Sequence, residues 1–419
     1  MQSATHFIAK LFRFKRYLKV TNFEFTNYNK ILTILVKPYK NGCRCGICGR
    51  RCEIVGFAKE SRCWRDIPIH GIEVWVAYHP REVLCPTHGR LQEEIPWAES
   101  LARVTYRFEY ALLRFAQQMP QKAGAQLLKI PKSTFSNLLH RIVTRVRSGH
   151  KIRGLTVLGV DEIGYCRGHK YATIAYDLDR SKVVWIGAGK GSATLECFLK
   201  THLSEYQRRQ IKYACCDMSQ AYISVIKRCL KSTTLVIDRF HVVKALSAAM
   251  DEVRKEEWRK VEKDDKLFFK GLRWILFRNS STRSNKQTRT INKLRRGKRG
   301  NNRIFRAWLL KDEFEHFWDY QYLGSAKKFL KNWTRRALLS RLEPMRKFVA
   351  TLREHEEHIL PYIETGLTNA KGEGINRVLQ MVKERACGFA NLDAFSDLIY
   401  LVIGDLDIPE QIPERFRTL

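Results

Sequence analysis

The chain has 419 residues, 44% of them hydrophobic, and 76 Lys and Arg against 42 Asp and Glu give it a formal net charge of +34 at pH 7. This length and apolar content can bury a sizeable core in about two to four domains, so a disordered chain is excluded. Charges interrupt every apolar stretch before the roughly 18 residues that a membrane-spanning helix needs, and Arg13, Lys15 and Arg16 break up any secretory signal. We therefore expect a cytoplasmic or nucleoid protein, with no membrane partner. Its charge points to a polyanion, and nucleic acid is the leading candidate.

Twelve cysteines in a reducing compartment indicate metal binding where they cluster at short spacing. After a basic lead-in at residues 1–40, the segment 41–100 contains one C-x2-C pair and one C-x2-H pair. These pairs are Cys45 with Cys48, and Cys85 with His88. Such ligands suit a structural, tetrahedral Zn²⁺, which would add folding free energy to a small module. The alternative is a core of reduced cysteines, and three further cysteines compete as ligands: Cys43, Cys52 and Cys63.

Residues 101–150 change to apolar positions at helical spacing and predict three helices, broken at Pro120 and around the "KIPK" of residues 129–132. A short helix, a tight turn and a longer helix with polar and then basic residues are typical of a helix-turn-helix domain that reads DNA. The side chains expected to contact DNA are Lys132, Ser133, Thr134, Asn137 and Arg141. A three-helix packing unit without a nucleic-acid role is the alternative.

From Leu155 the pattern changes to three strands, a helix, a strand, a helix and a strand. This order predicts an α/β fold over residues 151–260, with a mixed sheet flanked by helices. After His241 the pattern is helical as far as Tyr362, and residues 261–362 form a basic helical insertion. A final segment, residues 363–419, begins with turn residues and continues as a final amphipathic helix.

Within the insertion, no acid occurs between Asp265 and Asp312, whereas fifteen Lys or Arg do. Such a stretch is often only a solvated face or a disordered loop. Interleaved aromatic residues favour ordered helices that follow a phosphate backbone. The residues expected to contact DNA there are Arg295, Arg296, Lys298 and Arg299.

Carboxylates follow two strands of the predicted sheet. Asp161 follows the first strand and Asp217 follows the fourth, and strands in this order are expected to be neighbours, so the two side chains would meet at one end of the sheet. On the final helix, Glu373 and Asn376 lie on the polar flank, opposite an apolar stripe of Ile375, Val378, Leu379 and Val382, so the helix can dock with Glu373 at the edge of the sheet.

Three carboxylates so placed could hold two Mg²⁺ ions about 4 Å apart for an in-line phosphoryl substitution. Taken alone, each acid is better explained as a helix cap or a surface charge. Glu162 adjoins Asp161 and points to the opposite face of the strand, and periodicity does not choose between the two.

The strings "CRCGICGR" with "LCPTHG", "GVDEIGYCRGHKYATIAYDLD", "CCDMSQAY", "VIDRFHVVKAL" and "NAKGEGINRVLQMVKERACGF" run over most of the chain. In these strings, the sequence resembles the ISL-three family of bacterial insertion-sequence transposases. The resemblance implies a zinc-binding module, a helix-turn-helix domain for terminal inverted repeats, and an RNase H-like core interrupted by a helical insertion. It places a DDE triad on Asp161, Asp217 and Glu373, and so favours Asp161 over Glu162.

The resemblance also draws attention to Asp238 and His241, a D-x2-H pair after the fifth strand, as supporting residues. An N-cap role for Asp238 with a packed His241 is equally plausible.

We therefore expect a Mg²⁺-dependent DNA transposase that acts as a dimer or larger assembly on double-stranded DNA, both inverted repeats and target. One rival is a non-catalytic regulator that works through residues 1–150. Another is an RNase H-like nuclease for RNA or hybrid substrates.

Overall fold

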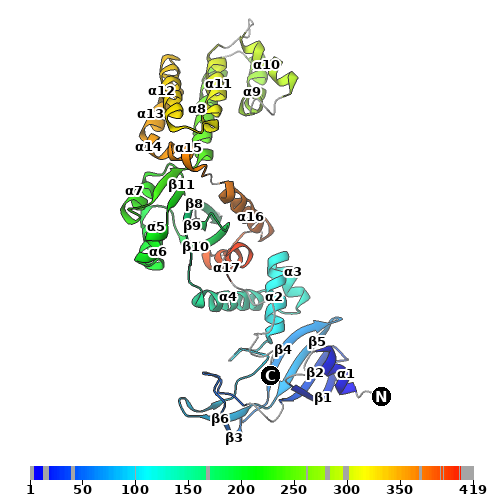
Figure 1. The fold of residues 1–419 in the computed structure, drawn as a ribbon. Coiled ribbons are helices and arrows are strands. Elements are labelled where there is room, and N and C mark those ends of the chain that lie inside the picture. Colours follow the sequence, from blue (N-terminus) through cyan, green and yellow to red (C-terminus); the bar gives the residue numbers. More distant parts are fainter. Residues whose placement is uncertain are drawn as a thin grey trace. The chain divides into compact units, whose positions relative to one another are not determined.

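The protein is described from a computed structural model, in which the chain forms two compact units (Figure 1). The described residues are 4–12, 18–38, 43–99, 101–166, 170–260, 263–278, 284–295, 302–367, 370–386, 388–389, 391–404 and 406. One unit comprises Met1–Lys151 and Leu379–Leu419, and the other comprises Ile152–Val378. Among the described residues, no helix is both long and apolar enough to cross a membrane.

Two small sheets open the first unit. The four-stranded sheet has the order β1-β2-β5-β4, formed by Leu18–Thr26, Ile31–Pro38, Ile72–Tyr78 and Arg62–Ile69. The three-stranded sheet has the order β3-β6-β7, formed by Glu53–Phe57, Arg81–Cys85 and Gly89–Gln92. Helix α1 (Ala4–Leu11) contacts β1. The lead-in strands β1 and β2 thus share a sheet with strands of the cysteine-bearing segment.

The β4–β5 hairpin shows how local sequence sets this sheet. Ile69 pairs with Ile72, so the turn has two residues, His70 and Gly71, whose φ angles are +47° and +77°. A two-residue turn with both φ angles positive matches the right-handed twist of the flanking strands. The register that follows buries Trp64, Val74 and Val76 completely in the core of this sheet.

The three predicted helices between residues 101 and 150 are confirmed. They are α2 (Tyr106–Gln118), α3 (Gln121–Leu127) and α4 (Lys132–Gly149). Pro120 and Pro131 occupy the N-cap positions of α3 and α4, where a missing N–H costs nothing, and Thr105 caps α2 by accepting from the Phe108 amide. Phe135 and Leu139, on the inner face of α4, are buried.

The expectation that the amphipathic helix at residues 370–386 is the last one is wrong. A further helix, α17 (Leu392–Ile403), follows it, capped by Asn391, and contacts α2 and α4 within the first unit. Residues 395–401 are all buried. The buried residues of α17 include the polar side chains Ser396 and Asp397, which interrupt the run of apolar residues.

A mixed five-stranded sheet forms the centre of the second unit, as predicted. Its order is β10-β9-β8-β11-β12, formed by Lys182–Ala188, Lys170–Asp177, Val157–Cys166, Tyr213–Cys216 and Thr234–Ile237. β8, β9 and β10 are antiparallel, whereas β8, β11 and β12 are parallel. The helical segments between these strands are α5 (Ser192–Cys197), the π-helix Phe198–His202, α6 (Glu205–Gln210) and α7 (Gln220–Cys229).

The long helical region is confirmed as well. It consists of α8 (Arg239–Lys260), α9 (Lys263–Phe277), α10 (Asn285–Arg295), α11 (Asn302–Phe314), the 3-10 helix Glu315–Asp319, α12 (Leu323–Leu339), α13 (Glu343–Glu354), α14 (Glu356–Ile359) and α15 (Pro361–Thr365). One hydrophobic core runs from the sheet into these helices and includes Val236, Phe314 and Trp333. Helix α16 (Ala370–Ala386) follows.

Helices α9, α10 and α11 confirm ordered structure for the described part of the basic stretch. Trp308 is buried on α11, whereas Trp274 on α9 is 73% exposed. Arg295 is the last residue of α10. Arg296, Lys298 and Arg299 lie outside the described residues.

A buried ion pair supports the small sheets of the first unit. Arg81 binds both oxygens of Glu93 through its guanidinium, and the side chains are only 10% and 4% exposed. The Glu93 carboxylate also accepts from the Tyr78 hydroxyl and from Cys43 Sγ at 3.3 Å. With this many partners, the charge is compensated inside the protein, and removal of one partner would leave the other unpaired.

We expect Glu93→Gln to destabilise the first unit by about 3–5 kcal/mol, because it keeps the side-chain volume but leaves the Arg81 charge buried without a counter-charge. The matched control is Glu82→Gln, which breaks the exposed Glu82–Arg90 pair and should cost less than about 1 kcal/mol. Urea unfolding of the full chain, followed by circular dichroism, measures both. Equal losses would show that the buried pair has no special role.

Candidate active site and metal cluster

Three aspartates lie side by side on three adjacent parallel strands. Asp217 and Asp238 directly follow β11 and β12, as expected for Asp217, but the expectation that Asp161 follows the first strand is wrong, because β8 continues past Asp161 to Cys166 in its pairing with β9. Cys215 of β11 pairs with Gly159 of β8, and two residues further along both strands this register makes Asp217 and Asp161 neighbours. Cys216 pairs with Ile237 of β12, so Asp217 is also level with Asp238. The prediction that the first and fourth strands are neighbours is therefore confirmed, and a third carboxylate, from Asp238, reaches the same end of the sheet.

The Asp161 carboxylate is held by two hydrogen bonds. Its Oδ1 accepts from the backbone N–H of Glu162 at 2.7 Å, and its Oδ2 accepts from Nδ2 of Asn376 on α16 at 2.7 Å. The Tyr176 hydroxyl of β9 donates to Oδ1 of Asn376 at 2.8 Å. Helix α16 therefore contacts the sheet through its polar flank, and the contact is to an expected catalytic acid.

Glu162 belongs to the other face of the sheet. It accepts a hydrogen bond of 2.8 Å from the Tyr222 hydroxyl on α7, which also lies 3.1 Å from Thr173 Oγ1. Figure 1 shows α5 and α7 on one side of the sheet and α16 on the other. The alternation of side chains thus places Asp161, and not Glu162, on the α16 face with Asn376.

Glu373 occupies the first turn of α16, three residues before Asn376. Residues three apart lie on the same side of a helix, so the backbone positions of the two residues share a flank. Three of the four residues of the opposite stripe are buried, because Ile375, Leu379 and Val382 are 2%, 0% and 3% exposed, whereas Val378 is half-buried.

Asp238 and His241 lie where β12 gives way to α8. The Asp238 carboxylate accepts from the Phe240 amide at 3.2 Å, as a helix cap does, and also lies 3.2 Å from His241 Nδ1. Burial of the imidazole opposes its protonation. The hydrogen bond to Asp238 and the charges of Asp238, Asp161 and Asp217 outweigh burial and raise the pKa of His241 above its ordinary value. The pKa of His241 therefore depends on the charges of all three carboxylates.

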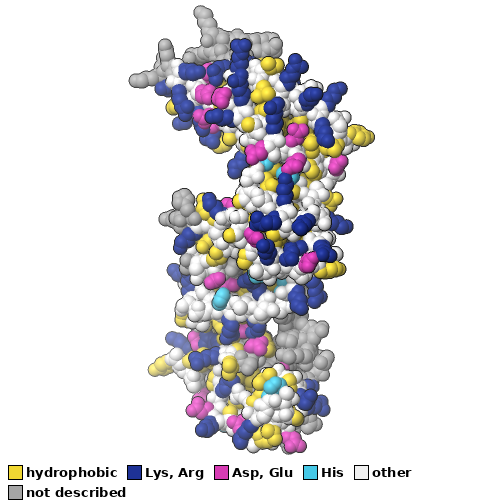
Figure 2. Space-filling view, turned by 90° about the vertical axis from the view of Figure 1, so that its left-hand side faces the viewer, with side chains coloured by type: hydrophobic (Ala, Val, Ile, Leu, Met, Phe, Trp, Pro, Cys, Tyr) yellow, Lys and Arg dark blue, Asp and Glu magenta, His cyan; other side chains and the backbone are white. Residues whose placement is uncertain are grey.

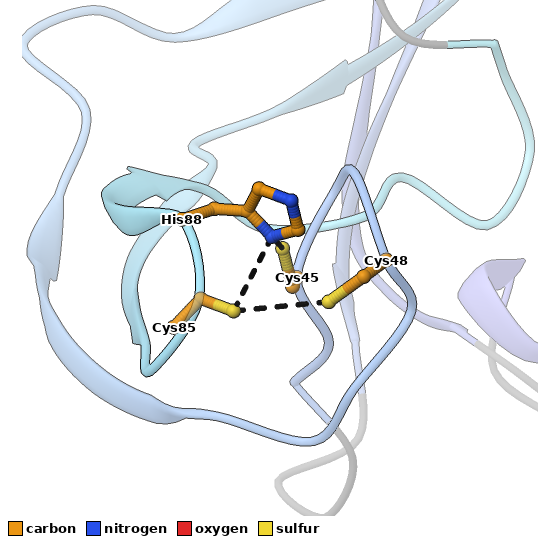
Figure 3. Close-up of side chains that lie close together, drawn as sticks. All are labelled: Cys45, Cys48, Cys85 and His88. Carbon is orange, nitrogen blue, oxygen red and sulfur yellow. Dashed lines mark hydrogen bonds between the residues drawn. The ribbon is translucent and has the colours of Figure 1, made fainter.

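The predicted C-x2-C and C-x2-H pairs come together in one cluster (Figure 3). One ligand atom from each of Cys45, Cys48, Cys85 and His88 lies within 4.8 Å of the others. The His88 Nδ1 is 3.6 Å from both Cys45 Sγ and Cys85 Sγ, and Cys48 Sγ is 3.7 Å from Cys85 Sγ. Such spacing leaves room at the centre for one tetrahedral ion with sulfur and nitrogen ligands.

The electrostatics of the cluster favour a thiolate at Cys85. Desolvation opposes its ionisation, but hydrogen bonds from the Thr87 amide, His88 and Cys48 outweigh it and lower the pKa of Cys85 to about 6. The surroundings of Cys43 have the opposite effect: burial and the Glu93 charge raise the pKa of this thiol to about 12 and so disfavour its thiolate. Cys52 donates to the Arg50 carbonyl, and Cys63 is exposed on β4. Within the described residues, these three competitors stay outside the cluster.

The ISL3 transposase family model, described as "Transposase", matches residues 158–399, which is more than half of the chain. This chain belongs to the ISL3 transposase family. The transposase for insertion sequence element IS1001 from Bordetella parapertussis is 28% identical over 87% of this chain and 90% of its own length. The transposase for IS1557 from Mycobacterium tuberculosis is 25% identical over 86% of both chains.

Among solved structures, the Drosophila P element transposase strand transfer complex is similar with a TM-score of 0.36 and 11% identity, over 72% of this chain and 92% of that chain.

A DNA transposase has to bind DNA, and the start of α4 offers polar side chains for this. Lys132, Ser133, Thr134 and Asn137 are exposed, while Ser136 Oγ donates to Gln121 and so joins α4 to α3. Arg141 is exposed as well, but its guanidinium binds the buried Glu109 carboxylate at 2.8 Å. Figure 2 shows Lys and Arg side chains spread over the face drawn, with fewer Asp and Glu among them.

We expect the pKa of His241 to fall when Asp238 is replaced by Asn, because burial of the imidazole remains while its charged acceptor is lost. In the parent transposase the folded-state pKa lies above the unfolded value near 6.5. The stability from this contact is therefore fully present below that pH and is lost as the pH rises through the folded-state pKa. Histidine NMR titration of the metal-free full chain measures the shift. Asp179→Asn is the control, because Asp179 lies in the turn between β9 and β10 and accepts from Thr156, just before β8. An unchanged pKa in Asp238→Asn would contradict the assignment.

Proposed function

We propose that this transposase cleaves and joins DNA in an RNase H-like core, with Asp161, Asp217 and Glu373 as the triad that binds two Mg²⁺ ions. The observation that carries the proposal is the meeting of Asp161 and Asp217 on adjacent parallel strands, with the helix of Glu373 docked beside them through Asn376. The strand order, three antiparallel strands followed by two parallel ones, fits the RNase H-like core that the family resemblance implies.

The donor atoms at this end of the sheet fit Mg²⁺. Asp161 and Asp217 supply carboxylate oxygens, the ligand type that this hard cation prefers, and Glu373 on α16 is the third acid of the proposed ligand set. When bound, the two ions would activate the attacking water or 3′-hydroxyl and stabilise the charge that develops during phosphodiester cleavage and strand transfer. The protein holds the ligands in place: hydrogen bonds orient Asp161, and the Ser219 amide donates to Asp217 Oδ1 at 3.0 Å.

Asp238 and His241 support the site from β12. The hydrogen bond to Asp238 raises the pKa of His241 against the effect of burial, which favours an imidazolium cation beside two triad acids. Such a cation balances the carboxylate charges and offers a donor for a DNA phosphate. We assign the pair a supporting role, since Asp238 also caps α8.

Specific DNA binding is assigned to the first unit. The exposed start of α4, with Lys132, Ser133, Thr134 and Asn137, is the surface for the terminal inverted repeats. Arg141 and the insertion residues Arg295, Arg296, Lys298 and Arg299 are assigned to phosphate contacts. Since two element ends have to be joined to one target, we propose a dimer or larger assembly on double-stranded DNA.

Two rival functions make different predictions in one assay. A non-catalytic regulator would need only residues 1–150 and would not cleave DNA. A nuclease for RNA or hybrid substrates would cleave a hybrid and ignore the end sequence. A cleavage assay that compares end-bearing duplex DNA with a hybrid of the same sequence separates these rivals from the proposed transposase.

We expect Asp161→Asn, Asp217→Asn and Glu373→Gln to retain end binding and to lose cleavage on the order of 10³-fold or more, because a metal ligand is removed. Glu162→Gln is the matched control, since Glu162 lies next to Asp161 but faces Tyr222, and it should keep most of the activity. Strand cleavage in Mg²⁺ is measured next to gel-shift binding of an inverted-repeat duplex. Undiminished cleavage by any of the three variants would remove that residue from the triad.

We propose Zn²⁺ as the ion for Cys45, Cys48, Cys85 and His88. The donors fit it, because three sulfur atoms and one imidazole nitrogen converge at mutual distances within 4.8 Å. The role is structural, since the four protein ligands fill a tetrahedral site and leave no position open for substrate. The ion would join the loop before β3 to the β6–β7 hairpin.

Zinc content tests this assignment. The parent chain should hold one equivalent of Zn²⁺, and Cys48→Ser should lose most of it together with stability, because zinc binding in small domains is also folding free energy, about 10 kcal/mol or more. Cys48 is exposed, so its replacement leaves the core packing intact. Cys63→Ser, an exposed cysteine on β4, is the control and should retain the metal. Elemental analysis and thermal unfolding give the two readouts, and full zinc content in Cys48→Ser would contradict the ligand set.

A further inference from the structure

Two donors hold Asp161, and they come from distant parts of the chain. Oδ1 accepts from the Glu162 amide within the same strand, whereas Oδ2 accepts from Asn376, 215 residues later in the sequence. An ionised carboxylate offers about four lone-pair sites. Two bonds at 2.7 Å to different oxygens therefore fix its rotation and still leave lone pairs on both oxygens for other ligands.

The orientation of the Asn376 amide follows from its neighbours. An ionised Asp161 accepts hydrogen bonds and cannot donate them, so the amide has to present its NH₂ group to the carboxylate. The amide oxygen then faces Tyr176, whose hydroxyl donates to it at 2.8 Å. Tyr176 is completely buried, and burial together with the Asp161 charge raises its pKa well above the ordinary value, so the hydroxyl keeps its proton.

Resting on the function proposed above, we propose that Asn376 is a positioning residue of the active site, with Tyr176 as the group that orients it. Asn376 fixes the metal-binding carboxylate of Asp161 and also sets the rotation of α16. Glu373 lies one turn earlier on the same flank of that helix. One amide therefore links the first and the third acid of the triad, which are far apart in the sequence.

Packing alone does not explain an asparagine at this place. The apolar stripe with Ile375 already buries one side of α16, and a leucine at 376 would bury more apolar surface with a better helix propensity. Asn376 is half-buried, and an amide withdrawn from water costs free energy unless its groups are paired; here both its N–H and its oxygen bind partners on the sheet. The polar contact thus serves the orientation of Asp161 more than the docking of the helix.

Mn²⁺ binding to the full chain tests the proposal without a reaction. We expect Asn376→Ala to weaken Mn²⁺ binding about 10–100-fold, the range for partners that orient a metal ligand. Tyr176→Phe should weaken it in the same direction and by less, because the amide remains but loses the hydroxyl that orients it. Electron paramagnetic resonance of free Mn²⁺ measures the affinity, and the half-saturating Mg²⁺ concentration for DNA cleavage should rise in parallel.

Two matched controls separate positioning from general damage. Arg377→Ala changes the exposed neighbour of Asn376 on the same helix. Tyr222→Phe removes the hydroxyl of another buried tyrosine, the one that donates to Glu162 on the opposite face of the sheet. Both variants should bind Mn²⁺ as the parent chain does. Amide hydrogen exchange over residues 370–378 should rise in Asn376→Ala and stay unchanged in Arg377→Ala, because only the former loses the contact to the sheet.

Parent-like Mn²⁺ affinity in both Asn376→Ala and Tyr176→Phe would overturn the positioning role, and so would equal weakening in Tyr176→Phe and Tyr222→Phe. If Asn376→Ala does not fold, Tyr176→Phe decides, because it removes a single oxygen atom. The proposed function fails by a different result, namely unchanged cleavage and Mn²⁺ binding in Asp161→Asn and Asp217→Asn.

Discussion

The parallel pairing of β8, β11 and β12 is the constraint on which the candidate active site of this transposase depends. Parallel strands run in the same direction, so their register alone brings Asp161, inside β8, level with the residues that follow β11 and β12. Those residues are Asp217 and Asp238. Antiparallel pairing of the same strands would send the carboxylates to opposite ends. The buried apolar residues of the strands, such as Val160 and Val236, hold this register and thereby hold the site.

The polar side chains on the two faces of the central sheet bind different helices. Asp161 and Tyr176 face α16, where an amide from the helix completes their hydrogen bonding. Glu162 faces α7, where the Tyr222 hydroxyl satisfies it. Adjacent acids are therefore separated by the alternation of a strand and by what packs on each side. On one face the polar groups orient Asp161, which we propose as a metal ligand, and on the other face they pair Glu162 with a buried tyrosine.

In the first unit, buried polar contacts and a cluster of possible metal ligands help to stabilise two small sheets. The buried Arg81–Glu93 pair and the Cys–His cluster both join segments around the β6–β7 hairpin. Asp66 of β4 accepts from Thr105 and Arg107 at the start of α2, so the four-stranded sheet and the helices are joined by buried polar contacts. Helix α17 packs on α2 and α4 of the same unit. Gln117 donates to its backbone, His140 binds Asp397, and the Arg147 guanidinium lies over the Tyr400 ring. The end of the chain thus helps to hold the segment assigned to DNA reading.

The sequence by itself determined the local elements and the ligand types: the order of strands, three helices separated by prolines, two metal-ligand pairs, and an aspartate directly after the fourth strand. It did not show that the first strand continues beyond Asp161. Periodicity and spacing carry this information because they depend on neighbours along the chain. Only the tertiary structure decided which acid of the Asp161–Glu162 pair faces α16, that Cys43 turns to Glu93, that α17 joins the helices of the first unit, and that Asn376 and Tyr176 hold Asp161. These contacts join residues up to hundreds of positions apart. Hydrogen bonds of that kind depend on register and packing between elements, which leave no periodic trace in the sequence.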